Sequence, residues 1–174
     1  ILVTIIEQFI VCNIYAPNDY KEKITFFKQL HDILCSFKEK YSQFSLIIGG
    51  DFNIHLSHLD SHDYKTFKKS KDWYECQNLL EKFNLSDVWR NSNPEDRFFT
   101  FSNSSSASRI DLFLVDNNLY ERFLIDSRIG QNKFKSDHYY ITLSIKEKSN
   151  SPSFIMWRLN DSILNRISVT TDVM

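Results

Sequence analysis

The sequence has few of the residues that mark turns and no excess of either charge. Its 174 residues include three Gly, three Pro and three Cys, and the formal net charge is −1. The three cysteines, at positions 12, 35 and 76, are odd in number and widely spaced, which excludes a fully paired disulfide framework and favours reduced core thiols. The balanced charge gives no global attraction to nucleic acid or to a membrane. No run of about 18 apolar residues is present, so no transmembrane helix is expected.

The composition is that of one folded domain. Hydrophobic residues make up 42% of the chain and charged residues 25%, at a length typical of a single domain. Runs rich in β-branched and aromatic residues alternate with two segments of helical periodicity. We therefore predict an α+β layered domain, with strands at 1–6, 9–15, 44–48, 98–101, 110–115 and 139–145 and helices at 21–41 and 72–84. The first two strands are expected to form a hairpin, and the second helix to bury Trp73, Cys76, Leu80 and Phe83.

Polar residues stand at the boundaries of the predicted strands. Asp51 follows a buried strand and a Gly-Gly pair that would permit a turn, and Asn53 can face the same side of an extended segment. An Asx-type turn is the alternative interpretation of this pair. Asp111 lies within a core strand, where a carboxylate is costly unless it is paired or binds a metal. Asp137 and His138 open the last strand, and an exposed loop pair is the alternative there.

These residues, together with Tyr15 at another strand end, would form a metal-assisted phosphodiester site if they met at one end of a sheet layer. Hard oxygen ligands favour Mg²⁺ or Mn²⁺. A His paired with an Asp can hydrogen-bond a scissile phosphate, and a second Asp can accept a proton from the attacking water.

Four short motifs follow one another along the chain: Asn13 to Asn18, Gly49 to Asn53, Ser108 to Asp111, and Ser136 to His138. In this order they resemble the endonuclease/exonuclease/phosphatase family, which includes deoxyribonuclease I and the apurinic/apyrimidinic endonucleases. Three further segments, Asp87 to Arg90, Phe99 to Ser102 and Met156 to Ser162, are similar to the endonuclease of LINE-type non-LTR retrotransposons.

The resemblance implies a four-layer α/β sandwich of the deoxyribonuclease I-like type and Mg²⁺-dependent nicking of DNA. Carried over by motif, Asp51 would orient or deprotonate the water, and Asp111 would hold His138 against the transition state. The remaining roles would fall to Asn53 and Asn18 at the phosphate, Tyr15 as a support for the phosphate or water, Asp137 at the metal, and Thr100 and Ser136 near the DNA.

The resemblance covers residues 1–147, roughly the C-terminal three-fifths of the family domain. No residue matches the principal Glu metal ligand of the family, so we expect this chain to be weakly active or inactive by itself. Residues 148–174 are expected to link the domain to a following reverse-transcriptase region.

Two other polar groups have simpler explanations. His55, His58 and His62 could suggest zinc, but neighbouring His in a polar loop usually bind no metal. A lysine run, made of Lys65, Lys68, Lys69 and Lys71, could touch DNA phosphates, although a solvated surface is the simpler interpretation.

The leading functional hypothesis is therefore a DNA endonuclease of a retrotransposon polyprotein, with DNA and the rest of that polyprotein as partners and no membrane. A phosphatase or RNA-cleaving enzyme of the same fold is one alternative. An inactive or domesticated remnant that at most binds nucleic acid is another. The resemblance also implies a nuclear location, because a target-nicking enzyme must reach chromosomal DNA.

Overall fold

The computed structural model describes residues 1–130 and 136–148, and the backbone of residues 154–157. Strands and helices follow one another along the chain in this order: β1 (Leu2–Ile6), β2 (Phe9–Tyr15), α1 (Tyr20–Lys40), β3 (Ser45–Asp51), η1 (His58–Asp60), η2 (Tyr64–Thr66), α2 (Lys71–Lys82), β4 (Leu85–Asp87), α3 (Val88–Ser92), β5 (Phe101–Ser102), β6 (Ala107–Ser108), β7 (Asp111–Asp116), α4 (Leu119–Arg122), β8 (Phe123–Ile129), β9 (Ile141–Glu147) and β10 (Phe154–Trp157). The predicted α+β class is confirmed.

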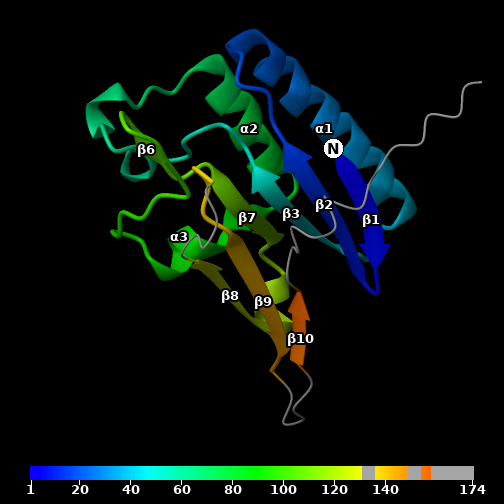
Figure 1. Ribbon diagram of the computed structural model, residues 1–174. Coiled ribbons are helices and arrows are strands. Elements are labelled where there is room, and N and C mark those ends of the chain that lie inside the picture. Colours follow the sequence, from blue (N-terminus) through cyan, green and yellow to red (C-terminus); the bar gives the residue numbers. More distant parts are fainter. Residues whose placement is uncertain (131–135, 149–153, 158–174) are drawn as a thin grey trace, which may run out of the picture.

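The main sheet has the strand order β1-β2-β3-β7-β4 (Figure 1). β1 and β2 form the predicted antiparallel hairpin, and Glu7 adopts a positive φ of 53° in its turn. β2 and β3 are parallel, and α1 makes the crossover that parallel neighbours require. β7 then runs antiparallel to β3, so the end of β3 lies beside the start of β7. This arrangement brings residues from distant parts of the sequence to one end of the sheet.

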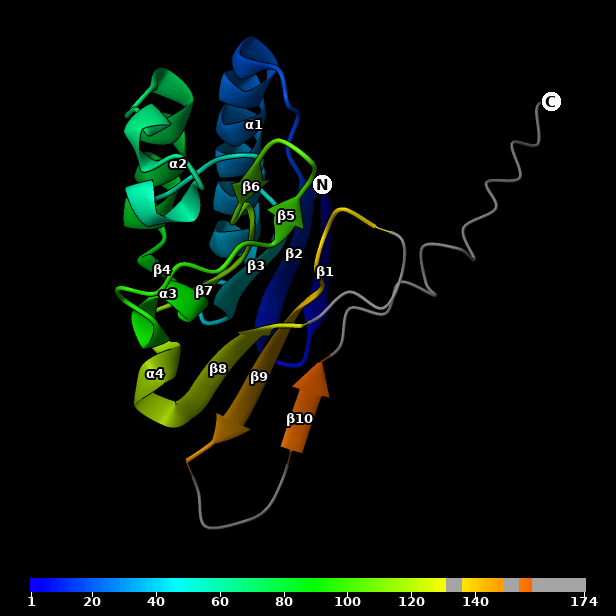
Figure 2. The same cartoon turned by 60° about the vertical axis from the view of Figure 1, so that its left-hand side comes forward.

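Alternate residues of the central strands face two separate cores. On one face, residues such as Ile10, Ile48 and Leu114 pack against α1 and α2. On the other face, residues such as Phe9, Ile47 and Val115 pack against the second sheet, of order β10-β9-β8. Figure 2 shows α1 and α2 side by side over one face of the main sheet and β8 to β10 below the other. The chain is thus a sandwich of helices, sheet and sheet.

Both long helices lie where their periodicity places them. Asp19 accepts hydrogen bonds from two amides of the first turn of α1, which explains why that helix begins after Asp19. In α2 the buried apolar residues are Cys76 and Leu79, whereas Trp73, Leu80 and Phe83 are partly buried. All four residues of the predicted stripe therefore pack on the core, and Leu79, which was not predicted, is buried with Cys76.

The glycine pair before Asp51 is a strand and not the predicted turn. Gly49 and Gly50 belong to β3 and pair with Phe113 and Leu112 of β7. A Cβ at Gly49 would lie 2.4 Å from the Phe113 ring, and one at Gly50 would lie 2.1 Å from the carbonyl oxygen of Ile14. Gly50 also has a φ of +131°, which favours glycine. Both glycines let neighbouring groups approach closely just before the polar residues begin.

Several elements lie outside the predicted set, among them β4, α3, β8 and β10. The predicted strand at 98–101 is shifted, since Phe98 is exposed and the pairing with β6 involves Phe101 and Ser102. β10 pairs with β9 through Phe154 to Trp157, within the range expected to be a linker. The sequence also allows a helix that starts near Asn160, and that segment lies outside the described residues. No described helix is long and apolar enough to cross a membrane.

Candidate active site

Three neighbouring strands of the main sheet present polar side chains at the same end. Tyr15, the last residue of β2, is the register partner of Asp51, the last residue of β3. Asp51 is in turn the register partner of Asp111, the first residue of β7. Sheet pairing alone therefore aligns two carboxylates that are sixty positions apart in the numbering.

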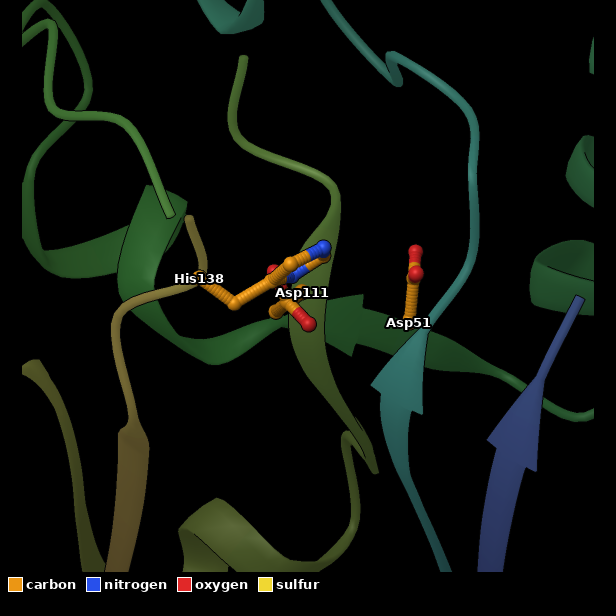
Figure 3. Close-up of side chains that lie close together, drawn as sticks. All are labelled: Asp51, Asp111 and His138. Atoms are coloured by element: carbon orange, nitrogen blue, oxygen red, sulfur yellow. The ribbon is translucent and has the colours of Figure 1, made fainter. Parts of the chain in front are cut away.

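His138 completes this group from the second part of the fold. Its Nδ1 lies 3.0 Å from Oδ2 of Asp111, and ligand atoms of Asp51, Asp111 and His138 all lie within 4.8 Å of one another. Figure 3 shows the His138 ring against Asp111, with Asp51 beside them at the end of β3. The Phe101 ring packs on the His138 ring with centroids 5.1 Å apart. The predicted Asp111–His138 pairing is confirmed.

Asn53 holds the carboxylate of Asp51 from the loop that follows β3. Its backbone amide donates to Asp51 Oδ1 at 2.8 Å, and its side-chain amide donates to the Ala16 carbonyl at 2.7 Å. Asn53 has a φ of 47°, a conformation that Asn tolerates better than most residues. Lys23 donates to the Asn53 carbonyl at 2.5 Å. The Asx turn, considered above as an alternative to a site, is therefore part of the site, because the turn orients the Asp51 carboxylate.

Burial governs the electrostatics of both carboxylates. Desolvation raises the pKa of Asp51 from the ordinary 3.8 to about 6, and the nearby Asp111 charge acts in the same direction. The amide of Asn53 and the charges of His138 and Lys23 act in the opposite direction but do not offset burial. Desolvation also raises the pKa of Asp111, against hydrogen bonds from Thr100 and His138. Two neighbouring acids that resist ionisation are typical of functional sites.

This shift predicts a pH-dependent gain in stability when the Asp51 charge is removed. Ionising a buried Asp51 is unfavourable, and that cost is fully present above about pH 6 and disappears as the pH falls toward 3.8. Asp51→Asn keeps an acceptor for the Asn53 amide. We expect it to raise the free energy of unfolding at pH 7.5 by up to about 3 kcal/mol, and to have little effect near pH 4. Urea denaturation in EDTA at both pH values checks this, and a stability gain at pH 4 alone would contradict it.

Thr100 lies under the pair and has no exposed surface. Its hydroxyl oxygen accepts from the amides of Ile110 at 3.0 Å and Asp111 at 2.9 Å, and its carbonyl accepts from Tyr139 at 2.6 Å. One residue therefore contacts the chain on both sides of the Asp111–His138 pair. This complete burial disfavours the predicted contact of Thr100 with DNA. The side chain instead positions Asp111.

Thr100→Val should therefore destabilise the protein more than Thr100→Ser. The valine leaves two buried amides without an acceptor, which costs about 1–3 kcal/mol, whereas serine keeps the hydroxyl. The matched control is Thr25→Val, because the Thr25 hydroxyl is exposed and makes a 3.4 Å bond within α1. Urea denaturation of the three variants provides the measurement. Equal stability of the valine and serine variants would show that the hydroxyl does not hold this segment.

The other predicted residues surround the group without joining it. Tyr15 is 69% exposed beside Asp51, and Asn18 is exposed in the loop before α1. Ser136 is exposed and its hydroxyl accepts from the His138 amide at 3.1 Å. Asp137 is exposed, and its carbonyl accepts from the Ser102 amide. The Asp137 carboxylate is not among the clustered ligand atoms, so its role as a metal ligand stays a prediction.

A buried ionic network behind the site was not predicted. Arg109 is 1% exposed and donates to Asp60 at 2.8 Å and to Asp87 at 2.6 Å. Arg90 donates to the same oxygen of Asp60 at 2.7 Å, and both guanidinium groups lie about 5 Å from the Trp89 ring. The sequence signal was an Arg directly before an apolar run and two residues before Asp111. The network fixes the backbone from which Asp111 projects.

The three loop histidines and the thiols are structural or peripheral. His55 Nε2 lies 2.9 Å from the Ser108 hydroxyl, and burial lowers the pKa of His55. No metal group containing His55, His58 or His62 forms among the residues that the structure describes. Cys12 and Cys76 are buried and free, and burial raises the pKa of each to about 12, so neither is a nucleophile.

Comparison with known proteins assigns the chain to a family. A sequence profile for the family described as Endonuclease-reverse transcriptase matches residues 9–142, more than half of the chain. The chain belongs to the endonuclease–reverse transcriptase family. A relative of this family member, the uncharacterized 149 kDa protein of transposon TX1 from Xenopus laevis, is 34% identical over 158 residues. That alignment covers 87% of this chain and 11% of the Xenopus protein.

Solved structures share the fold of this endonuclease–reverse transcriptase family member. The 3′-5′ exonuclease NExo of Neisseria meningitidis has a TM-score of 0.70 at 23% identity, over 84% of this chain and 64% of the exonuclease. An AP endonuclease of Archaeoglobus fulgidus has a TM-score of 0.62 at 20% identity, over 83% of this chain and 63% of the endonuclease. A NExo structure described as a 3′ phosphatase bound to a product DNA hairpin has a TM-score of 0.69 at 22% identity, over 84% and 64% of the two chains. The deoxyribonuclease I-like fold expected from the sequence is confirmed, and the chain spans less than two thirds of each solved structure.

Proposed function

We propose that the chain is part of a Mg²⁺-dependent DNA endonuclease that hydrolyses a phosphodiester and nicks target DNA for retrotransposition. The observation that carries the proposal is the group of Asp51, Asp111 and His138, whose ligand atoms lie within 4.8 Å at one end of the sheets. It belongs to a chain of the endonuclease–reverse transcriptase family. A phosphodiester needs a proton acceptor for water and a donor to the phosphate, and the group offers both.

Each residue has a role that its contacts support. Asp51, oriented by the Asn53 amide, accepts a hydrogen bond from the attacking water and takes its proton. His138 donates to a phosphate oxygen through the ring nitrogen opposite Nδ1, because Nδ1 faces Asp111. Asp111 fixes that tautomer and offsets the charge of the ring. Exposed Tyr15 and Asn18 stand at the rim, where they contact the phosphate or the water.

The donor set fits Mg²⁺ or Mn²⁺. The buried carboxylate of Asp51 and the partly buried one of Asp111 lie side by side with raised pKa values, so a divalent cation would offset the cost of their charges. Mg²⁺ is commonly held by one or two carboxylates, with water and phosphate as further ligands. Asp51 and Asp111, with the predicted ligand Asp137, are the residues that would hold it. When bound, the cation would neutralise charge that develops on the phosphate.

The relatives favour DNA nicking over the other reactions of this fold. A transposon protein is 34% identical to the chain, and a structural neighbour is described as bound to a product DNA hairpin. A 3′ phosphatase activity is the second candidate, since that same neighbour is described as a 3′ phosphatase. We also propose that the rest of a transposon polyprotein acts with this chain in cis and that the enzyme works in the nucleus.

The test compares three substrates with Mg²⁺ and with EDTA. Supercoiled plasmid reports nicking, a duplex with a 3′ phosphate reports phosphatase activity, and a single-stranded RNA reports RNA cleavage. The 174-residue chain is assayed both alone and within any longer polypeptide that contains it, since the chain spans 64% of the exonuclease structure. We expect Mg²⁺-dependent nicking in the longer protein and weak or no nicking in the short chain. Phosphate release without nicking would favour the phosphatase, and inactivity of both would favour a remnant.

A further inference from the structure

A basic arm lies on the surface between η2 and the start of α2. It consists of Lys65, Lys68, Lys69 and Lys71, and no acid stands between residues 64 and 71. The formal charge of this short segment is therefore +4 (four Lys, no Asp or Glu), in a chain whose net charge is −1. All four lysines are exposed. Such a concentration of one sign on a nearly neutral chain is a local attraction for an anion.

The lysines of the arm have no acidic partners among the described residues. Asp72, which follows the arm in the sequence, is instead paired with the buried Lys23 at 3.6 Å. The ammonium group of Lys69 lies 4.9 Å from the centroid of the Trp73 ring, a cation–π contact with no acidic partner in the described part of the chain. The segment is thus unlike the exposed Arg128–Asp126 pair on β8, where the two charges are satisfied internally at 2.8 Å. Unpaired cations are available to an external polyanion.

The arm is held at both ends by contacts with segments that lead to the catalytic group, those before Asp111 and after Asp51. On one side, the His62 amide donates to Ala107, Ser61 bridges to Ser108, and Arg97 donates to the Ser61 carbonyl at 2.7 Å. On the other side, Lys23 joins the Asn53 carbonyl to Asp72, next to Lys71. The Trp73 indole donates to the Leu56 carbonyl at 3.1 Å. Figure 1 shows this region at the end of the sheet where β3 stops.

We propose that the basic arm binds the backbone of duplex DNA on the α2 side of the scissile phosphate. The inference rests on the proposed endonuclease function. An anchored row of lysines beside a phosphodiester site matches a polymer whose charges repeat every few ångströms, and it needs no base contacts. The arm would add affinity and fix the direction in which the duplex lies across Asp51 and His138, without changing the chemical step.

The test neutralises two lysines of the arm and two lysines elsewhere. The arm variant is Lys65→Gln with Lys68→Gln, which leaves the ring contact of Lys69 and the helix start intact. The control variant is Lys40→Gln with Lys82→Gln, at the far ends of α1 and α2, where both side chains are exposed. Net charge changes equally in both. Fluorescence anisotropy follows a labelled duplex of about 20 base pairs in EDTA, over KCl from about 50 to 200 mM, a range in which phosphate contacts change affinity steeply.

We expect the arm variant to lose affinity several-fold at low salt and its log–log salt slope to fall by about 1–2, because each phosphate contact contributes about 0.9. The control variant should keep the wild-type slope. Equal losses in both variants, or an unchanged slope in the arm variant, would overturn the proposal, as would a wild-type protein that binds no duplex DNA. A loss confined to duplex RNA of the same sequence would assign the arm to RNA and overturn it as well.

The same experiment separates the arm from the proposed function. Nicking with Mg²⁺ and the effect of Asp51→Asn on it test the endonuclease, whereas binding in EDTA tests the arm. If the arm variant loses DNA affinity but no protein nicks, the arm stands and the endonuclease proposal fails. If nicking depends on Asp51 while both lysine variants bind alike, the endonuclease stands and the arm fails.

Discussion

His138→Ala and Asp51→Asn are each expected to lower the rate of plasmid nicking by at least about 10²–10³-fold, the loss typical of removing one group that stabilises a transition state. The first variant removes the donor to the phosphate. The second keeps the shape of the side chain and its bond with Asn53 but removes the proton acceptor. The measurement is the initial rate of conversion of supercoiled to nicked plasmid, in the longest form of the protein that is active.

A second His–Asp pair offers a matched control for this prediction. His31 lies 3.3 Å from Asp32 on α1, away from the strand ends that carry the site. His31→Ala should leave the nicking rate within about two-fold of the wild type, because surface changes away from a site rarely alter it. A loss of similar size in this control would mean that the assay reports folding and not chemistry. Nicking that survives both site variants would point to a contaminating nuclease.

The coupling between Asp111 and His138 can be measured in the same assay. If Asp111 acts only by orienting His138, Asp111→Asn should reduce the rate, and adding it to His138→Ala should cost almost nothing more. An additive loss in the double variant would show that Asp111 has a separate role, such as holding the cation. The double-mutant cycle therefore distinguishes a positioning carboxylate from a ligand.

The site was predictable because its residues stand where strands end. A carboxylate in an apolar run, as at Asp111, and a polar residue after a buried strand, as at Asp51, are local signals that need no knowledge of the fold. That Asp51 and Asp111 lie side by side could not be derived from these local signals, since it depends on the antiparallel pairing of β3 with β7. The turn predicted from the glycine pair before Asp51 was wrong. The two glycines remain in the strand, where they leave room for the Phe113 ring and the Ile14 carbonyl.

What sequence reasoning missed has a common physical cause in long-range packing. β8 did not look like a half-buried strand, because it exposes Leu124 and buries Ser127, the reverse of what hydrophobicity suggests. The role of Thr100 could not be read locally, since its hydroxyl accepts amides ten and eleven positions away. Asp60 stands in a polar stretch of the sequence, yet it is fully buried because two arginines from other segments reach it.

Arg109→Met is expected to destabilise the protein strongly. The substitution removes the cation that Asp60 and Asp87 share. The Asp60 side chain has no exposed surface and that of Asp87 is 8% exposed. Removing one partner of a buried ion pair typically costs about 3–5 kcal/mol, because an uncompensated charge stays in the core. Urea denaturation followed by tryptophan fluorescence measures the loss, and Trp89 reports directly because its ring contacts Arg109.

The control and the rescue for Arg109 distinguish a buried charge from lost packing. Arg128→Met breaks a pair whose arginine is 82% exposed, so it should cost less than about 1 kcal/mol. Adding Asp87→Asn to Arg109→Met removes one stranded charge, and the asparagine can still accept from the Arg90 amide that starts α3. The double variant should therefore be more stable than Arg109→Met alone. If Asp87→Asn destabilised it further, the loss would come from packing around Trp89, and the network would not be what holds Asp111 in place.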